Sequence, residues 1–225
     1  MDNVMQIMEA RHSVRQYTDK KIDGEVLGLL KAEIDQINRT TGVDFQLILD
    51  EPGAFSGFLP RYGKFQGVSN YVGLIAPKSP NCEEKVGFLG ERLVLKAQQL
   101  GLNTCWVGLS YSRRKLKLRI PKNEKLYCVL ALGYGSTQGI RHKSRKIDDL
   151  TDAAQPRPEW FLEGMKAAML APTAVNQQHF KVSLTDDGRV RIVSTGGFYS
   201  KMDLGIVKYQ FEQGAGKDFP GFTAG

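Results

Sequence analysis

Cysteine and histidine are both scarce in this sequence. Its 225 residues include only three of each, namely Cys82, Cys105, Cys128, His12, His142 and His179. No two cysteines form a Cys-x-x-Cys pair, and the histidines lack the spacing of metal ligands. The sequence therefore gives no support to a zinc site or a redox dithiol, and its odd, widely spaced cysteines favour a reducing cytoplasm.

Long apolar runs are absent as well. No stretch approaches the roughly 20 apolar residues that span a bilayer. The first residues, Met-Asp-Asn-Val-Met, lack the basic start and the apolar region of a secretory signal. With 41% hydrophobic and 24% charged residues, the composition is that of a globular protein that folds without a disulfide or a metal. We expect a cytoplasmic protein that makes no membrane contact.

Acidic residues are fewer than basic ones, with 24 aspartates and glutamates against 31 lysines and arginines, which leaves a formal charge of +7. Such a balance favours an anionic partner, either a phosphate-bearing small molecule or a nucleic acid. The basic residues form short local groups without interleaved aromatics, and no helix-turn-helix, RRM or zinc-finger pattern is present. We expect a small-molecule partner and no nucleic acid, with a basic nucleic-acid-binding protein as the outside alternative.

The hydrophobic periodicity predicts helices and strands in alternation. Helices are predicted over 25–38, over 86–100, from about Trp160, and after Asp203. Strands are predicted around 45–49, 71–75, 126–132, 180–184 and 190–193, and the segment 103–109 directly follows the second helix. The helix and strands of the last third resemble the beginning of the chain in order, which suggests a degenerate internal repeat; two unrelated helix-strand units are the alternative.

Two basic groups have the chemistry of phosphate ligands. Arg11-His12-Ser13-Val14-Arg15 places two guanidinium groups and a hydroxyl within five residues, which suits charge-assisted hydrogen bonds. Lys143-Ser144-Arg145 follows the glycine-rich end of a predicted strand. Taken singly, a solvated basic turn and a solvated loop explain these groups equally well.

A third segment, Ala171 to Gln178, offers amides and free backbone groups. Pro172 breaks a helix there, and small and amide residues follow before the next strand begins. Such a segment can bind a flat heterocycle that is rich in carbonyls and ring nitrogens. A helix C-terminus with an asparagine cap is the alternative.

Together these segments resemble the nitroreductase family. Arg11 to Tyr17 matches the family pattern Arg-[Arg/His]-Ser-x-[Arg/Lys]-x-[Phe/Tyr] at every defined position. Ala171 to Gln178 is similar to Ala-Pro-Ser-x-x-Asn-x-Gln, with Thr173 in place of serine and without the usual Pro-Trp that follows. Gly101 to Gly108 resembles Gly-Leu-Gly-Thr-x-Trp-x-Gly, and Lys143 to Arg145 resembles a late basic group of some members.

The motifs stand in a permuted order, because the Ala-Pro-Thr segment comes last. The order resembles a subgroup in which one chain carries two half-copies of the fold. The resemblance implies an α+β fold: an αβα sandwich with a central, mainly antiparallel sheet and helices on both faces. Residues 1–154 and 155–225 would be the two halves of one integrated unit, a pseudo-dimer.

By resemblance, the cofactor is flavin mononucleotide (FMN) and the reductant is NADH or NADPH. Basic and hydroxyl groups would bind its phosphate, Val107 and Gly108 would lie at the flavin edge, and Lys64 would lie beside N1 and O2. The implied cofactor-binding residues are Arg11, His12, Ser13, Arg15, Lys64, Val107, Gly108, Lys143, Arg145, Pro172, Thr173, Ala174 and Asn176. No general acid or base and no metal is expected, since the flavin carries the hydride.

The implied activity is hydride transfer from NAD(P)H through FMN to a small flat acceptor, such as a nitroaromatic, a quinone or a flavin. The alternative is a redox-inactive flavin-binding or ligand-binding module, because Val107 and the missing Pro-Trp depart from the family pattern. We expect either a monomer with one complete site per chain or a homodimer.

Overall fold

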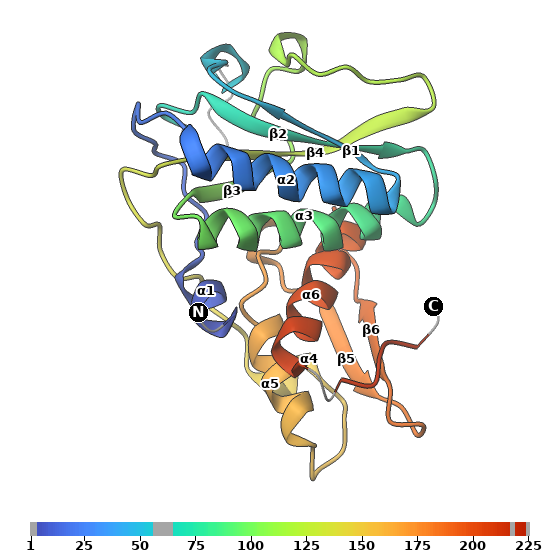
Figure 1. Ribbon diagram of the computed structural model, residues 1–225. Coiled ribbons are helices and arrows are strands. Elements are labelled where there is room, and N and C mark those ends of the chain that lie inside the picture. Colours follow the sequence, from blue (N-terminus) through green and yellow to red (C-terminus); the bar gives the residue numbers. More distant parts are fainter. Residues whose placement is uncertain (1–3, 56–64, 217–218, 224–225) are drawn as a thin grey trace. The chain divides into compact units, whose positions relative to one another are not determined.

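The structure is a computed structural model that describes residues 4–55, 65–216 and 219–223 (Figure 1). Its internal contacts divide the chain into two compact units. The sheet unit comprises residues 10–82 and 93–141, and the C-terminal unit comprises residues 1–9, 83–92 and 142–225. Helix α3 (Cys82–Gln99) contributes its first part to the C-terminal unit and its second part to the sheet unit.

The sheet unit contains a four-stranded antiparallel sheet in the order β1-β2-β4-β3. Its strands are β1 (Asp44–Ile48), β2 (Asn70–Pro77), β3 (Asn103–Val107) and β4 (Glu124–Gly133). The two central strands, β2 and β4, are buried along nearly their whole length, as their apolar runs predict. Strand β3 lies at an edge, which leaves one side of it to be covered by other parts of the chain.

Helices cover one face of this sheet (Figure 1). Helix α2 (Gly24–Thr41) lies along that face with its buried stripe of Leu30, Ile34 and Ile37, and the second part of α3 lies beside it. Helix α2 ends at Gly42, whose φ of 70° lies in the left-handed region that glycine adopts without strain.

Among the described residues, no long helix covers the opposite face, which differs from the expected sandwich. Ala54 of the short helix η1 (Pro52–Phe55) and Leu118 pack there against Tyr71. Gly73 leaves room for Leu118, because a Cβ at position 73 would lie 2.5 Å from Leu118 Cδ1. In this unit, therefore, one face carries helices and the other carries extended chain and the short helices η1 and η2 (Arg113–Lys115).

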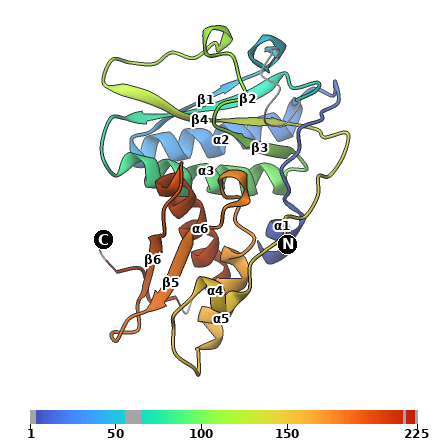
Figure 2. The same cartoon turned by 180° about the vertical axis from the view of Figure 1, so that it is seen from behind.

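The C-terminal unit combines helices with a separate two-stranded sheet (Figure 2). Its elements are α1 (Val4–Ala10, up to residue 9), the first part of α3, α4 (Ile147–Leu150), α5 (Glu159–Ala168), η3 (Ala174–Asn176), β5 (Phe180–Leu184), β6 (Val190–Ser194) and α6 (Ser200–Ala215). Helices α5 and α6 pack through the rings of Phe161 and Phe211, whose centroids lie 5.7 Å apart. Strands β5 and β6 form an antiparallel hairpin next to α6.

Helices α3 and α6 approach closely within the C-terminal unit because glycines face each other's backbone. A Cβ at Gly205 of α6 would overlap the carbonyl oxygen of Glu84, and a Cβ at Gly87 of α3 would overlap that of Met202. A fully buried polar pair lies at the same helix contact, where Gln210 Nε2 donates to Glu91 Oε1 at 2.6 Å. Small residues at two positions therefore define this helix contact.

The predicted order of helices and strands is confirmed, apart from four elements. The last helix begins at Ser200 rather than after Asp203, and the short helices α1 and α4 and the strand β3 have no counterpart in the prediction. The internal repeat and the boundary between residues 154 and 155 stay predictions.

Within the described ranges, no helix is both long and apolar enough to cross a membrane. The same residues contain no group of three or more histidine, cysteine or acidic side chains placed to hold a metal ion. All three cysteines are free and buried.

Candidate cofactor-binding site

The Arg11 to Tyr17 segment covers the open edge of β3. Val14 N donates to Thr104 O of β3 at 3.0 Å, which pairs the segment with the strand in parallel. Farther on, Gln66 N donates to Arg15 O, and Tyr17 N donates to Gln66 O, both at 2.9 Å. The backbone on both sides of Arg15 is thus fixed, and this limits where the predicted phosphate ligands can point.

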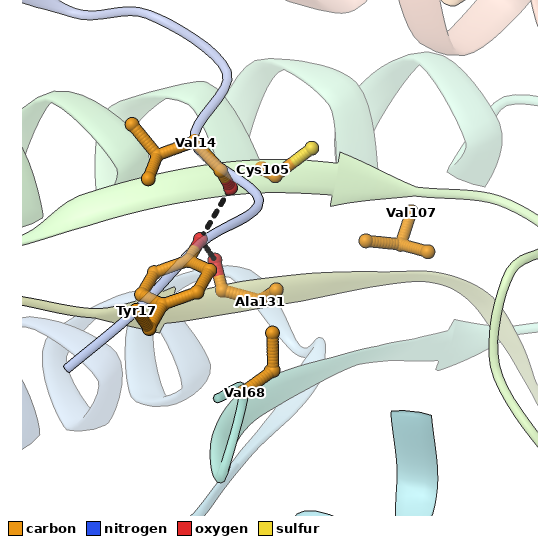
Figure 3. Packing of buried hydrophobic residues seen from close by; sticks show 6 residues of the cluster. All are labelled: Val14, Tyr17, Val68, Cys105, Val107 and Ala131. Carbon is orange, nitrogen blue, oxygen red and sulfur yellow. Dashed lines mark hydrogen bonds between the residues drawn. The ribbon is translucent and has the colours of Figure 1, made fainter. Parts of the chain in front are cut away.

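Tyr17 holds the Arg11 to Tyr17 segment against the sheet (Figure 3). Its hydroxyl donates to Val14 O at 2.7 Å, and its ring packs in a buried cluster with Val68, Cys105 and Ala131. Burial raises the pKa of the Tyr17 hydroxyl well above its usual value. The aromatic position that ends the first motif is therefore part of the core.

Arg11, Ser13 and Arg15 all influence Cys105 of β3. Burial raises the pKa of the Cys105 thiol, while the positive charge of Arg15, a hydrogen bond from Ser13 and the charge of Arg11 lower it. Arg11 is buried, with 3% of its surface exposed, whereas Arg15 is exposed. The three residues assigned to phosphate thus all affect the Cys105 thiol, and Arg15 is accessible from solvent.

The turn after β4 packs against the same segment. Gly139 adopts a φ of 75°, and a Cβ there would come within 2.7 Å of His12 Cβ. Asn103 holds this turn, because its Oδ1 accepts from Gly135 N at 2.9 Å and its Nδ2 donates to Gln138 Oε1 at 3.0 Å. The sequence alone did not identify Asn103 as the residue that makes this contact. Asn103 does, however, stand where the family pattern Gly-Leu-Gly-Thr-x-Trp-x-Gly has its second glycine.

The remaining predicted residues of the sheet unit lie at the end of β3. Val107 is buried in the cluster of Tyr17, and its carbonyl oxygen accepts from the Cys128 thiol at 3.3 Å. Gly108 follows and is partly exposed. Lys64 lies outside the described residues.

In the C-terminal unit, the structure brings together two of the predicted segments. Asn176 Nδ2 and Gln178 Nε2 each donate to Lys143 O at 2.9 Å, and Arg145 N donates to Gln178 Oε1 at 2.9 Å. Ser144 Oγ donates to Met169 O at 3.1 Å. The backbone of 143–145 is therefore held while the side chains of Lys143 and Arg145 are exposed.

The loop that makes these contacts has an uncommon backbone. Val175, Asn176 and Gln178 have φ angles of 45°, 56° and 47°. Left-handed backbone is rare in residues other than glycine and strained for a β-branched valine, and such strain clusters at functional sites. Thr173 Oγ1 accepts from Gln178 N at 3.0 Å and closes the loop. Pro172 precedes the loop and is partly exposed.

A buried carboxylate supports the loop from α6. Asp203 is 8% exposed, and Ala174 N donates to its two oxygens at 3.0 and 3.1 Å. Gln177 Nε2 donates to Asp203 Oδ2 at 2.7 Å. Burial raises the pKa of Asp203 to about 6, although these hydrogen bonds and the nearby His179 lower it. Sequence reasoning missed Asp203, since nothing local in the sequence connects it with a loop 29 residues earlier.

The antiparallel sheet and the helical unit with its hairpin define an α+β protein with a nitroreductase-like fold. Residues 3–215 match the family model described as "Putative TM nitroreductase", and the chain belongs to this family. No match was found among curated proteins.

Solved structures agree on the fold. A "putative nitroreductase" from Thermotoga maritima is 24% identical, with 94% of this chain and 83% of that chain covered and a TM-score of 0.69. A "putative nitroreductase in complex with FMN" from Desulfovibrio desulfuricans is 20% identical, with 70% and 98% covered and a TM-score of 0.51. A "Putative NADH dehydrogenase/NAD(P)H nitroreductase" from Bacteroides thetaiotaomicron is 18% identical, with 67% and 96% covered and a TM-score of 0.52. At these identities the likeness concerns the fold alone.

Proposed function

We propose that this protein is an FMN-dependent oxidoreductase of the nitroreductase type, which passes hydride from NADH or NADPH to a small flat acceptor. The observation that carries the proposal is the junction of Lys143–Arg145 with the Ala171–Gln178 loop. These segments are distant in sequence, the family resemblance gives both to one cofactor, and three hydrogen bonds join them. Membership of the family supports the same conclusion.

Each of the two units offers groups that suit a phosphorylated flavin. A phosphate dianion needs several fixed donors, and the chain offers Ser13 and Arg15 on a backbone held by β3, and Lys143 and Arg145 on a backbone held by the loop. The loop itself offers amides and strained backbone suited to a flat ring rich in acceptors.

Each part of the chain has a separate role in this proposal. Arg11, Ser13, Arg15, Lys143 and Arg145 bind the phosphate, with His12 contributing its backbone. Val107 and Gly108 leave room at the edge of the flavin, and Pro172, Thr173, Ala174 and Asn176 contact its ring system. When bound, FMN supplies the hydride acceptor and donor, so no side chain of the protein is needed as a general acid or base.

The absorbance spectrum of the purified protein, reconstituted with FMN, tests this function. We expect a yellow protein that NADH or NADPH bleaches and that an added quinone or nitroaromatic turns yellow again. A yellow protein that neither nucleotide bleaches would instead support a redox-inactive flavin-binding module. A protein that binds no flavin and shifts DNA or RNA would support the nucleic-acid alternative.

A further inference from the structure

The loop of Thr173 to Gln178 is held at two points by one carboxylate. Ala174 N and Gln177 Nε2 both donate to Asp203 in the first turn of α6. These two residues bracket Val175 and Asn176, which have left-handed backbone. Both ends of the strained pair are therefore tied to the first turn of α6.

The support continues from the loop to the basic segment. Asn176 and Gln178 donate to Lys143 O, and Gln178 accepts from Arg145 N. A chain of hydrogen bonds thus runs from Asp203 through the loop to the backbone that carries two exposed cations. Gln177 Nε2 also donates to Phe198 O at 2.9 Å, which ties the turn before α6 into the same arrangement.

Stability alone does not account for an ionised group at this place. Burial of Asp203 disfavours its charged form and raises its pKa to about 6. The strained backbone of Thr173–Gln178, which this carboxylate contacts, is a second unfavourable feature. The buried charge and the left-handed backbone both lower stability at this loop. Their coincidence indicates that the geometry of the loop has been selected.

We propose that Asp203 is a positioning residue, whose ionised carboxylate holds Thr173–Gln178 in the conformation that grips Lys143–Arg145 and so orders this part of the cofactor site. The consequence for FMN rests on the proposed function, whereas the effect on the loop does not. Protonation of Asp203 removes the charge that accepts from Ala174 N and Gln177 Nε2, so the surroundings of both donors change as the pH falls through 6. His179 is the titratable group whose charge acts on Asp203, and it must be tested separately.

The first experiment follows the loop in the protein without flavin. The chemical shift of the Ala174 amide proton is recorded by NMR from about pH 4.5 to about pH 8. We expect one titration step near pH 6 in the wild type and in His179→Gln, and no step in Asp203→Asn. Asp187→Asn is the matched control, because it makes the same change in an exposed hairpin turn and leaves the step in place. A step that persists in Asp203→Asn would overturn the proposal.

The second experiment measures FMN binding. The phosphate of FMN titrates in the same pH range, so the informative quantity is the ratio of the dissociation constants of Asp203→Asn and wild type. We expect this ratio to be about ten near pH 8, the loss of a hydrogen bond to a charged group, and to approach one near pH 5. Asp187→Asn should give a ratio of one at both values.

A second variant covers the case in which Asp203→Asn does not fold. Gln177→Leu removes one donor, keeps the carboxylate, and should weaken FMN binding severalfold while the Ala174 step persists. Unchanged FMN affinity in every folded variant of Asp203 and Gln177 would refute the effect on the site. If the wild type binds no FMN at all, the proposed function fails, and the NMR titration alone then decides whether Asp203 positions the loop.

Discussion

Two arginines from different parts of the sequence carry the phosphate hypothesis. Arg11→Ala or Arg145→Ala should each weaken FMN binding by roughly 1.5 to 3 kcal/mol, the range for hydrogen bonds to charged groups. Isothermal titration of the flavin-free protein measures this directly. Arg119→Ala is the control, because Arg119 is an exposed cation in the segment that covers the other face of the sheet. Full affinity in the double variant would remove both residues from the phosphate site.

Tyr17 makes a separate contribution to stability. Tyr17→Phe keeps the ring in its cluster but removes the hydrogen bond to Val14 O. Because a buried acceptor is then left without its donor, we expect a loss of about 1 to 2 kcal/mol in the free energy of unfolding. Urea denaturation at neutral pH measures it. A loss far above this would mean that the ring itself moves, which a changed near-ultraviolet circular dichroism spectrum would reveal.

Asp203 makes the stability depend on pH in a direction opposite to that of most surface carboxylates. Its pKa is raised from 3.8 to about 6 on folding, so the folded state binds the proton more tightly than the unfolded state does. The corresponding stabilisation is fully present below about pH 4 and is lost as the pH rises through 6. Relative to Asp203→Asn, the wild type should lose up to about 3 kcal/mol between these limits. Denaturation curves of both proteins across this range would show a constant difference if the shift were absent.

At the scale of elements, the contact between α3 and α6 depends on two glycines. Gly205→Ala places a methyl group on the carbonyl oxygen of Glu84, and Gly87→Ala does the same to Met202. The backbones cannot yield without separating the helices, so each change should cost about 1 to 3 kcal/mol, as overpacking does. Thermal and urea unfolding measure the loss.

Gly28 provides the matched control for these substitutions. It lies on the exposed side of α2, and a Cβ there would meet nothing within 4 Å. Gly28→Ala should therefore stabilise the protein by up to about 1 kcal/mol, because alanine favours helix more than glycine does. Equal losses at Gly28 and Gly205 would show that helix propensity, rather than close packing, governs the contact.

Periodicity alone predicted the elements whose buried side is regular. The spacing of Leu30, Ile34 and Ile37 gave the position of α2, and those residues are its buried stripe. The covering of the opposite face was not predicted, since Leu116 and Leu118 alternate with basic residues in a stretch that reads as a solvated loop. Helix α1 was missed because its seven residues bury only Met8, too few to establish a period.

The candidate site was predictable to the extent that its chemistry lies in local motifs. Motifs identified the segments around Arg11, Lys143 and Asn176, and the structure joins the last two by hydrogen bonds. They could not identify Asn103 or Asp203, because these residues act on backbone brought near them by folding. Short motifs therefore predict the groups that meet a ligand better than those that hold them in place.

At the scale of the whole molecule, the order of the motifs raises the question of how many chains make one site. In ordinary family members, by resemblance, the Ala-Pro-Ser segment that meets a given flavin comes largely from the neighbouring subunit. Here the corresponding segment lies late in the same chain as Arg11 to Arg15. We predict one complete FMN site per chain, with all its residues from one polypeptide, so that a single chain is sufficient.

Mixing two defective variants tests this prediction. One variant carries Arg11→Ala together with Arg15→Ala, and the other carries Asn176→Ala together with Thr173→Ala. If each chain forms its own site, both variants stay empty after mixing, because every chain still lacks one set of residues. If the sites are shared between chains, as in a domain-swapped dimer, an equal mixture forms some sites with both sets intact. FMN fluorescence, measured after the two variants are unfolded and refolded together, distinguishes the two cases. Recovered FMN binding would show that each site needs two chains. No recovery would show that one chain is enough.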